Sequence, residues 1–183
     1  LSKKGKLFMN ETINNLINRR SCKNFDPNRV VEDEKLNLIL EAGKYAANGR
    51  GLQAASMVVV QNKDVISKLS QLNASILGAS GIDPFYKATT VIVVFANPVA
   101  HTYIEDGSLV IGNLMNAAFS LGVDSCWIHR AREMFETEIG KELKKEWGIA
   151  ENLIGIGNCV LGYRAADLAN PKPRKEDFVR FVK

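Results

Sequence analysis

Apolar positions along the chain recur with helical periods in some stretches and strand periods in others, and these periods predict the secondary structure. The helical stretches are Ile13–Ile17, Glu32–Ala46, Val65–Ser75, Ile104–Leu121 and Glu133–Trp147. The strand-like stretches are Ser56–Gln61, Thr89–Ala96, Cys126–Ile128, Leu153–Leu161 and Phe178–Val182. Helices precede the first strand and the two types then mix without a strict β-α-β rhythm, which predicts an α+β layered domain.

Two of these elements are more apolar than a surface element needs to be. The strand Thr89–Ala96 is apolar on both faces, which predicts a sheet covered on both sides. The helix Ile104–Leu121 carries apolar residues around most of its circumference, so we expect it to lie centrally. In a chain of only 183 residues, such a helix predicts that a second subunit supplies part of its cover.

The composition is that of one globular domain, with 46% hydrophobic and 24% charged residues. Since no repeat or linker interrupts the pattern, we assign residues 9–183 to a single domain and Leu1–Phe8 to a leader or basic tail. The net charge of +4 falls to about +1 without the three lysines of that tail. Such a charge is too weak to predict binding of nucleic acid.

Cysteine usage predicts a reduced, cytoplasmic protein. Cys22, Cys126 and Cys159 are odd in number and widely spaced, and they form no Cys-x-x-Cys pair and no cysteine–histidine spacing that would predict a metal site. The sequence also contains no apolar run of roughly 18 residues and no signal-peptide pattern. We therefore expect neither secretion nor membrane insertion.

A glycine-rich loop satisfies a dinucleotide-binding pattern but lies in the wrong context. Gly49, Gly51 and Ala54 match G-x-G-x-x-A, which requires a preceding strand and a following helix. Here the loop follows a helix and enters a strand. We therefore reject a Rossmann site, while the two glycines still permit close approach of the backbone to a flat ligand.

Cys126 and His129 lie close enough in sequence to suggest a nucleophilic pair. In a short strand, however, the side chains of residues 126 and 128 point to one face and that of residue 129 to the other. A structural Cys126 is therefore the favoured interpretation, with His129 at the edge of a pocket.

Two basic clusters lie near opposite ends of the chain. Arg19, Arg20 and Lys23 accompany Ser21 just beyond a predicted helix end, whereas Lys172 and Arg174 lie in a proline-bounded tail. Guanidinium groups suit phosphate oxygens, so the two clusters together could clamp one phosphate. A solvated basic face is an equal alternative from these residues alone.

Four motifs in order resemble the FMN-dependent nitroreductase family. Arg19–Phe25 resembles its Arg-Arg-Ser-x-Arg/Lys-x-Phe signature, and Ala46–Gln53 resembles its flavin-covering loop, with Ala47 and Asn48 in place of proline and serine. The helix from Glu105 and the turn ending in Ser125–Ile128 resemble its dimer helix and Gly-x-x-Ser-Cys-Trp-Ile turn. Pro171–Lys175 resembles its Pro-Lys-x-Arg tail, and the similarity extends from about Met9 to the end of the sequence.

The resemblance implies a nitroreductase-like fold, with a mostly antiparallel central sheet flanked by helices, and an intertwined homodimer with FMN at the subunit interface. The basic residues and Ser21 would hold the phosphate and ribityl chain, Lys23 would lie near the pyrimidine edge of the flavin, and Asn73 matches an asparagine on that side. The implied cofactor contacts are Arg19, Arg20, Ser21, Lys23, Ala47, Asn48, Gly49, Gln53, Asn73, Cys126, Trp127, Ile128, Lys172 and Arg174.

The activity that the resemblance implies is a ping-pong oxidoreductase. NAD(P)H would reduce FMN and leave, and a nitroaromatic, quinone or activated alkene would then take the electrons in the same space, without an acid–base side chain. Two alternatives stay open, because a fold alone does not define a reaction. One is a protein of the same fold that binds or processes flavin without reductase turnover, and the other is a basic protein-interaction domain without a cofactor.

Overall fold

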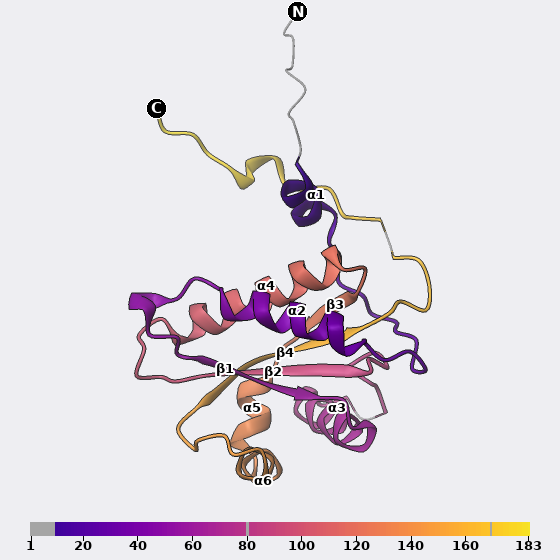
Figure 1. Cartoon of the computed structure of the whole chain (residues 1–183), viewed down its shortest axis with the longest axis vertical. Helices are drawn as coiled ribbons and strands as arrows, with labels where there is room; N and C mark the ends of the chain where they lie inside the picture. The colour runs from indigo at the N-terminus through magenta and orange to yellow at the C-terminus, as the bar shows by residue number, and fades with distance from the viewer. Residues whose placement is uncertain (1–9, 80, 169) are drawn as a thin grey trace, which may run out of the picture.

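The computed structural model describes residues 10–79, 81–168 and 170–183 (Figure 1). The helices of these ranges are α1 Glu11–Asn18, α2 Asp33–Lys44, α3 Lys63–Leu77, α4 Tyr103–Ser120, α5 Ala131–Glu136 and α6 Glu138–Glu146. The strands are β1 Ala55–Val60, β2 Thr90–Ala96, β3 Asp124–Ile128 and β4 Ile154–Gly162. Two 3₁₀ turns, η1 Gly49–Gly51 and η2 Glu176–Phe178, complete the described elements. The predicted tail Leu1–Phe8 lies outside the described residues.

The strands form one antiparallel sheet, as the resemblance implied, and their order is β1-β2-β4-β3. Every residue of β2 is buried, which confirms the prediction of a sheet covered on both faces. Its side chains alternate between two cores, because Val91, Val93 and Phe95 pack into one cluster and Ile92 and Val94 into the other.

Helices α2 and α4 cover one face of the sheet, and α3, α5 and α6 lie on the other (Figure 1). Glycines allow α4 to pack closely against its neighbours. A Cβ on Gly43 of α2 would lie 2.8 Å from Leu114 Cδ2, and one on Gly107 of α4 would lie 2.7 Å from Ile156 Cγ1. These approaches place α4 against both α2 and the central strands, as its apolar circumference predicted.

Two predicted elements are wrong in detail. The helix expected over Glu133–Trp147 is broken into α5 and α6 at Thr137, whose hydroxyl donates to Met134 O at 2.7 Å and accepts from Gly140 N at 3.0 Å. A threonine with an extended backbone satisfies the amides that begin a new helix, which explains the break. The expected strand Phe178–Val182 is instead a 3₁₀ turn and exposed irregular chain, since no neighbouring strand pairs with it in the described structure.

The two ends of the described chain extend away from the sheet and its covering helices (Figure 1). Helix α1 contains no buried residue, although Ile13, Leu16 and Ile17 form an apolar stripe along it. Phe178 and Phe181 in the tail are also largely exposed. One subunit therefore leaves apolar surface uncovered at both of its ends.

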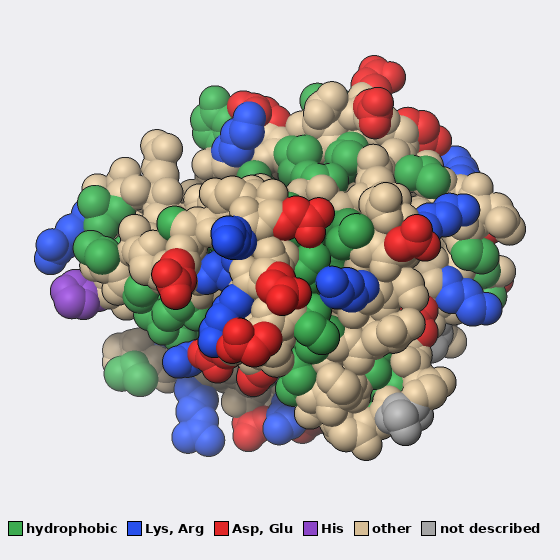
Figure 2. Space-filling view, turned by 90° about the horizontal axis from the view of Figure 1, so that it is seen from below, with side chains coloured by type: hydrophobic (Ala, Val, Ile, Leu, Met, Phe, Trp, Pro, Cys, Tyr) green, Lys and Arg blue, Asp and Glu red, His purple; other side chains and the backbone are tan. Residues whose placement is uncertain are grey.

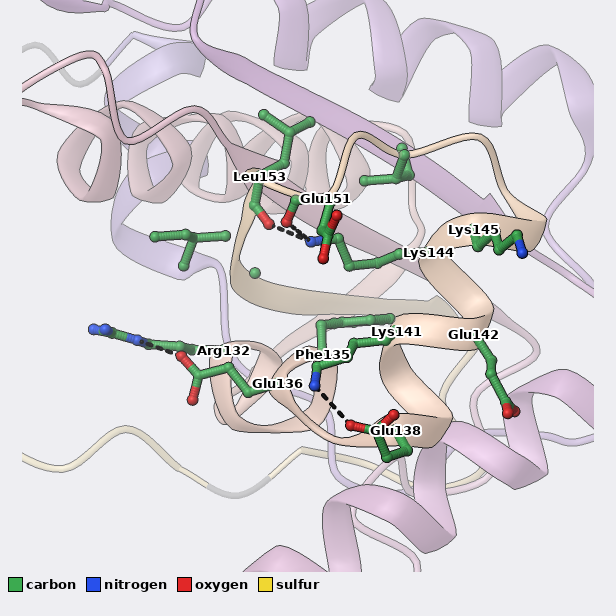
Figure 3. A pocket seen from close by; sticks show the side chains of 13 residues that line it. Arg132, Phe135, Glu136, Glu138, Lys141, Glu142, Lys144, Lys145, Glu151 and Leu153 are labelled. Carbon is green, nitrogen blue, oxygen red and sulfur yellow. Dashed lines mark hydrogen bonds and ion pairs between the residues drawn. The ribbon is translucent and has the colours of Figure 1, made fainter.

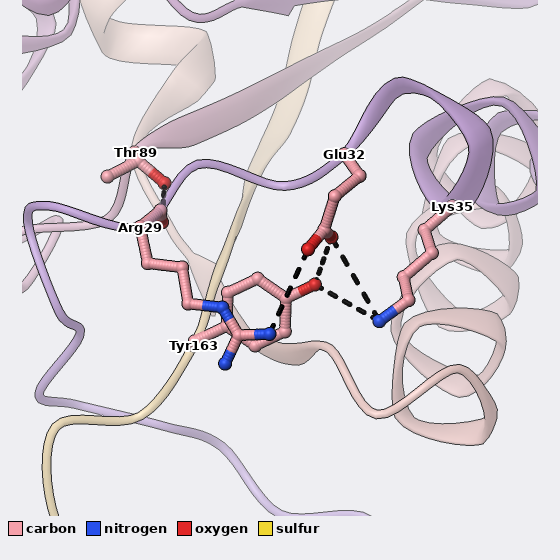
Figure 4. Close-up of polar contacts among 5 residues, drawn as sticks. All are labelled: Arg29, Glu32, Lys35, Thr89 and Tyr163. Carbon is pink, nitrogen blue, oxygen red and sulfur yellow. Dashed lines mark hydrogen bonds and ion pairs between the residues drawn. The ribbon is translucent and has the colours of Figure 1, made fainter.

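A polar cluster joins the segment before α2 to the end of β4 (Figure 4). Tyr163 donates a hydrogen bond to Glu32 Oε2 and accepts one from Lys35 Nζ at 3.2 Å, and the Arg29 guanidinium lies 3.4 Å from the centroid of the tyrosine ring. The backbone oxygen of Tyr163 also accepts from Asp26 N at 2.8 Å. The cluster therefore helps to anchor the chain that follows the basic motif.

We expect Tyr163→Phe to destabilise the protein at neutral pH and to have little effect in acid. The hydrogen bond from Tyr163 is the largest of the effects that hold the pKa of Glu32 below its ordinary value of 4.5, followed among the side chains by Lys35 and Arg29. A lowered pKa in the folded state contributes stability above the unfolded pKa, and this contribution is lost as the pH falls through the folded pKa.

Urea unfolding of the wild type and Tyr163→Phe at about pH 7 and about pH 3 measures this dependence. Tyr45→Phe is the control, because Tyr45 is exposed and makes no side-chain hydrogen bond with the described residues. A Tyr163→Phe effect of equal size at both pH values would contradict the role of Glu32.

Candidate functional site

The basic motif lies along the free edge of the sheet, beside β3. Ser21 forms a parallel bridge with Ser125, and Cys22 N donates to Ser125 O at 2.9 Å. Farther along, Phe25 bridges Arg164 just after β4. The segment is therefore held to β3 at one point and to the end of β4 at another.

Buried side chains reinforce these backbone contacts. Cys22 and Phe25 are buried in the core beneath the segment, whereas Ser21 and Lys23 are exposed. Asp124 is also buried, and its Oδ2 accepts from both the backbone N and Nε of Arg164 at 3.0 Å. These anchors fix the backbone while leaving Ser21 and Lys23 free to meet a ligand.

Arg19 carries one buried guanidinium nitrogen that forms no hydrogen bond with the described residues. Its Nη1 is shielded from solvent and has no hydrogen-bond acceptor there, and the same is true of the Ser125 hydroxyl oxygen. Ser21, two residues after Arg19, pairs with Ser125 along the backbone. The Arg19 guanidinium and the Ser125 hydroxyl therefore belong to the same part of the structure. Desolvated polar groups without partners are costly, and they indicate a place where a polar ligand binds.

The charges of Arg19 and Lys23 both act on Cys126. Burial raises the pKa of the Cys126 thiol, and the neighbouring Ser21, Lys23 and Arg19 oppose this rise only in part. The thiol therefore stays protonated at neutral pH, which argues against a nucleophilic cysteine. The predicted placement of Cys126 and Ile128 on one face is confirmed, because both pack in one core whereas Trp127 packs against the other.

The loop Ala47–Gln53 lies at the other edge of the sheet, where it leads into β1. The Asn48 side chain shapes it by accepting a hydrogen bond from Gln53 N at 3.0 Å. Arg50 and Gln53 adopt left-handed backbone conformations, with φ of 56° and 48°. The predicted flavin-covering loop and the basic motif therefore lie at opposite edges of one subunit, as Figure 1 also shows.

Comparison with known proteins identifies the family from the sequence. The nitroreductase family profile matches residues 16–163. The chain belongs to the nitroreductase family. This result confirms the predicted resemblance. The match extends from just before the basic motif to just past the end of β4.

Individual relatives agree with the family assignment. A Staphylococcus epidermidis protein that carries the name of an NAD(P)H nitroreductase is 28% identical, over 92% of this chain and 95% of its own length. An Archaeoglobus fulgidus protein named for NADH dehydrogenase and NAD(P)H nitroreductase is 29% identical, over 85% of this chain and 86% of its own.

Solved structures share the fold. The Bacteroides fragilis nitroreductase with bound FMN has a TM-score of 0.87 and 26% identity, covering 96% of this chain and all of its own. The Desulfitobacterium hafniense nitroreductase with bound FMN has a TM-score of 0.86 and 25% identity, with the same coverage. The nitroreductase fold predicted from the motifs is thus confirmed.

Several predicted cofactor residues are not brought together with Arg19. The Arg20 Nη1 donates to Ile17 O at 2.7 Å and to Arg19 O at 2.9 Å, so its guanidinium turns back toward the end of α1. Lys172 and Arg174 are exposed in the tail and form no hydrogen bond with the residues that the structure describes. The two-cluster phosphate clamp therefore stays a prediction.

Asn73 is fully enclosed at 0% exposure. Its Nδ2 donates to His129 O at 2.7 Å, and its Oδ1 has no hydrogen-bond partner within the described ranges. The side chain thus supports the turn after β3, and its contact with a cofactor stays a prediction. The sequence-based list omitted Ser125, although it directly precedes Cys126 in the motif.

The protein also has a large surface cavity of about 750 Å³ between α5, α6 and residues 149–155, away from the basic motif (Figure 3). Lys144 is buried in its wall and donates to Glu151 O and Leu153 O, both at 2.7 Å, and burial lowers the pKa of this lysine. These bonds hold the turn before β4. Figure 2 shows this face of the molecule, where acidic and basic side chains are intermixed.

Residues 10–79, 81–168 and 170–183 contain neither a metal-binding cluster nor a membrane-spanning helix. No group of histidine, cysteine, aspartate and glutamate side chains there is arranged to hold a metal ion. Among the helices of the same ranges, none has the length and apolar character required to cross a membrane.

Proposed function

We propose that this protein is an FMN-dependent oxidoreductase that passes electrons from NAD(P)H to an electron-poor acceptor such as a nitroaromatic, a quinone or an activated alkene. One observation carries the proposal: the Arg19 Nη1 is buried without a partner among the described residues, beside a basic motif fixed to β3. A phosphate oxygen would satisfy this guanidinium.

The residues present fit FMN. Arg19 offers a desolvated donor, and Ser125 and Ser21 offer hydroxyls that suit a phosphate or ribityl chain. The family membership supports the same cofactor, since the B. fragilis and D. hafniense relatives are nitroreductases with bound FMN. When bound, FMN supplies the hydride and electron transfer.

The protein's own part is binding and electrostatics. Lys23 projects from the fixed segment and is exposed, so its ammonium is free to balance the negative charge of a reduced cofactor. Trp127 packs against the core cluster on the opposite face of β3 from Cys126. The proposed electron transfer requires no acid–base residue of the protein. If NAD(P)H and the acceptor occupy the same space in turn, a ping-pong order of binding follows.

The proposed assembly is a homodimer with FMN at the interface. The basic motif and the Ala47–Gln53 loop lie at opposite edges of one subunit, so a partner would supply the loop to each site. Apolar residues of α1 and the tail are exposed in one chain, and a partner would cover them. The proposed cytoplasmic location rests on Cys22, Cys126 and Cys159, which are free thiols.

Anaerobic stopped-flow mixing of the FMN-loaded protein with NADH and with NADPH tests the activity. Rapid bleaching of the visible band of oxidised flavin is expected with at least one of them, followed by recovery when a quinone is added. Parallel lines in double-reciprocal initial-rate plots are expected for a ping-pong order. An FMN-loaded protein whose band is unchanged by both nucleotides would instead favour flavin binding without reductase turnover.

A further inference from the structure

Asp106 in α4 is a buried acid that the predicted cofactor site does not use. Only 3% of the residue is exposed, and its Oδ1 accepts a hydrogen bond from Gly49 N at 2.9 Å. Its Oδ2 is buried and has no hydrogen-bond partner among the described residues. The carboxylate thus joins the central helix to a loop that lies 57 residues earlier in the sequence.

This arrangement is costly unless it has a structural purpose. Burying a carboxylate is unfavourable when its hydrogen bonds are incomplete, and none of the ion pairs among the described residues includes Asp106. Val110 and Ile111 of the same helix lie in an apolar core, so an apolar side chain at position 106 could be accommodated in place of the aspartate. The specific feature that the carboxylate adds is an acceptor for the Gly49 amide.

The loop that receives this contact has a backbone that needs external support. Arg50, Gly51 and Gln53 have φ values of 56°, 67° and 48°, which are left-handed conformations. A Cβ on Gly49 would collide with Thr102 Oγ1, so the loop lies directly against the start of α4. Besides the Asp106 contact, the loop contains a hydrogen bond that the Gln53 backbone N–H donates to the Asn48 side-chain oxygen.

Asp106 also lines a small cavity of about 130 Å³ together with Ala47, Asn48 and Gln53. These three residues and Gly49 are the loop positions predicted to contact the cofactor of the partner subunit. The buried acid therefore lies directly behind the surface that the loop would present.

We propose that Asp106 is a positioning residue that holds the Ala47–Gln53 loop through the Gly49 amide and thereby strengthens FMN binding across the subunit interface. The link to FMN rests on the function proposed above, whereas the link to the loop does not. The role requires an acceptor oxygen at this position, so Asp106→Asn preserves it and Asp106→Ala or Asp106→Leu removes it.

Hydrogen exchange of the FMN-free protein tests the loop directly. In Asp106→Ala, the amides of residues 47–53 are expected to exchange at least about tenfold faster than in the wild type. Asp106→Asn should exchange at nearly the wild-type rate. Glu105→Gln is the matched control, because Glu105 is the adjacent, exposed acid of the same helical turn. If Asp106→Ala does not fold, Asp106→Leu removes the acceptor with a similarly branched side chain.

FMN titration of the same variants tests the consequence. The dissociation constant is expected to rise about tenfold in Asp106→Ala or Asp106→Leu and to stay near wild type in Asp106→Asn and Glu105→Gln. Unchanged loop exchange in both acceptor-free variants would overturn the proposal, as would faster exchange with unchanged FMN affinity. A wild type that binds no FMN would refute the proposed function, while the exchange experiment would still decide whether Asp106 holds the loop.

Discussion

The double variant Arg19→Ala, Arg174→Ala is expected to purify as a colourless protein, whereas the wild type should be yellow with bound FMN. Arg19 supplies a buried guanidinium nitrogen that has no acceptor among the described residues, and Arg174 matches the arginine of the Pro-Lys-x-Arg tail that the resemblance places on the phosphate. Loss of charge-assisted hydrogen bonds to a phosphate costs about 2–5 kcal/mol for each buried contact, which is enough to lose the cofactor during purification.

Absorbance at the flavin band, together with titration of the FMN-free protein, measures this effect. The single variants separate the two clusters: Arg19→Ala tests the motif beside β3, and Arg174→Ala tests whether the tail reaches the same phosphate. Arg132→Ala is the control, because Arg132 is exposed on α5 and pairs with Glu136. A double variant that stays yellow would contradict the phosphate site, and a colourless wild type that FMN cannot reconstitute would overturn the proposed cofactor.

Gly140→Ala is expected to lower the free energy of unfolding by about 3 kcal/mol or more. Among the stability effects predicted for this protein, this is the largest. A Cβ at Gly140 would lie 2.6 Å from Phe135 Cα and would collide with Met134 O. These atoms belong to the backbone of α5, so no side-chain rotation relieves the overlap. The tight turn at Thr137 that separates α5 from α6 would have to open.

Thermal and urea unfolding of Gly140→Ala measure this loss. Glu142→Ala is the matched control, because Glu142 is exposed on the same helix and should change stability by no more than about 0.5 kcal/mol. Alanine is intrinsically the better helix former, by about 1 kcal/mol over glycine. A Gly140→Ala protein as stable as the wild type would therefore show that relieving the overlap costs only about 1 kcal/mol, and it would contradict the expected loss.

The same turn explains where sequence-based prediction failed. The spacing of apolar residues over Glu133–Trp147 is helical on both sides of Thr137, so a single helix was expected. The break depends on the Thr137 hydroxyl satisfying Gly140 N and on the close crossing of the two helices. Such a crossing involves tertiary contacts that periodicity does not contain.

The site was predicted in part. The residue types of Arg19, Ser21 and Lys23 indicated an anion site, and four motifs in order indicated the family. The separate orientation of Arg20 and the position of Ser125 beside Ser21 were missed, because both depend on how the segment lies against α1 and β3. Asp106 belongs to the helix that resembles the family's dimer helix, but its contact with Gly49 depends on how the loop packs against α4.

Local sequence patterns thus determined most of the helices and strands and the covered sheet, because alternation and helical periods reflect which side chains are buried. Four motifs in order indicated the family. Only the tertiary structure decided which polar groups lose water without gaining a partner among the described residues. Arg19 Nη1, the Ser125 hydroxyl and the Asp106 Oδ2 are such groups. The physical reason is that desolvation depends on atoms from distant parts of the chain, and these distant contacts distinguish an ordinary basic motif from a binding site.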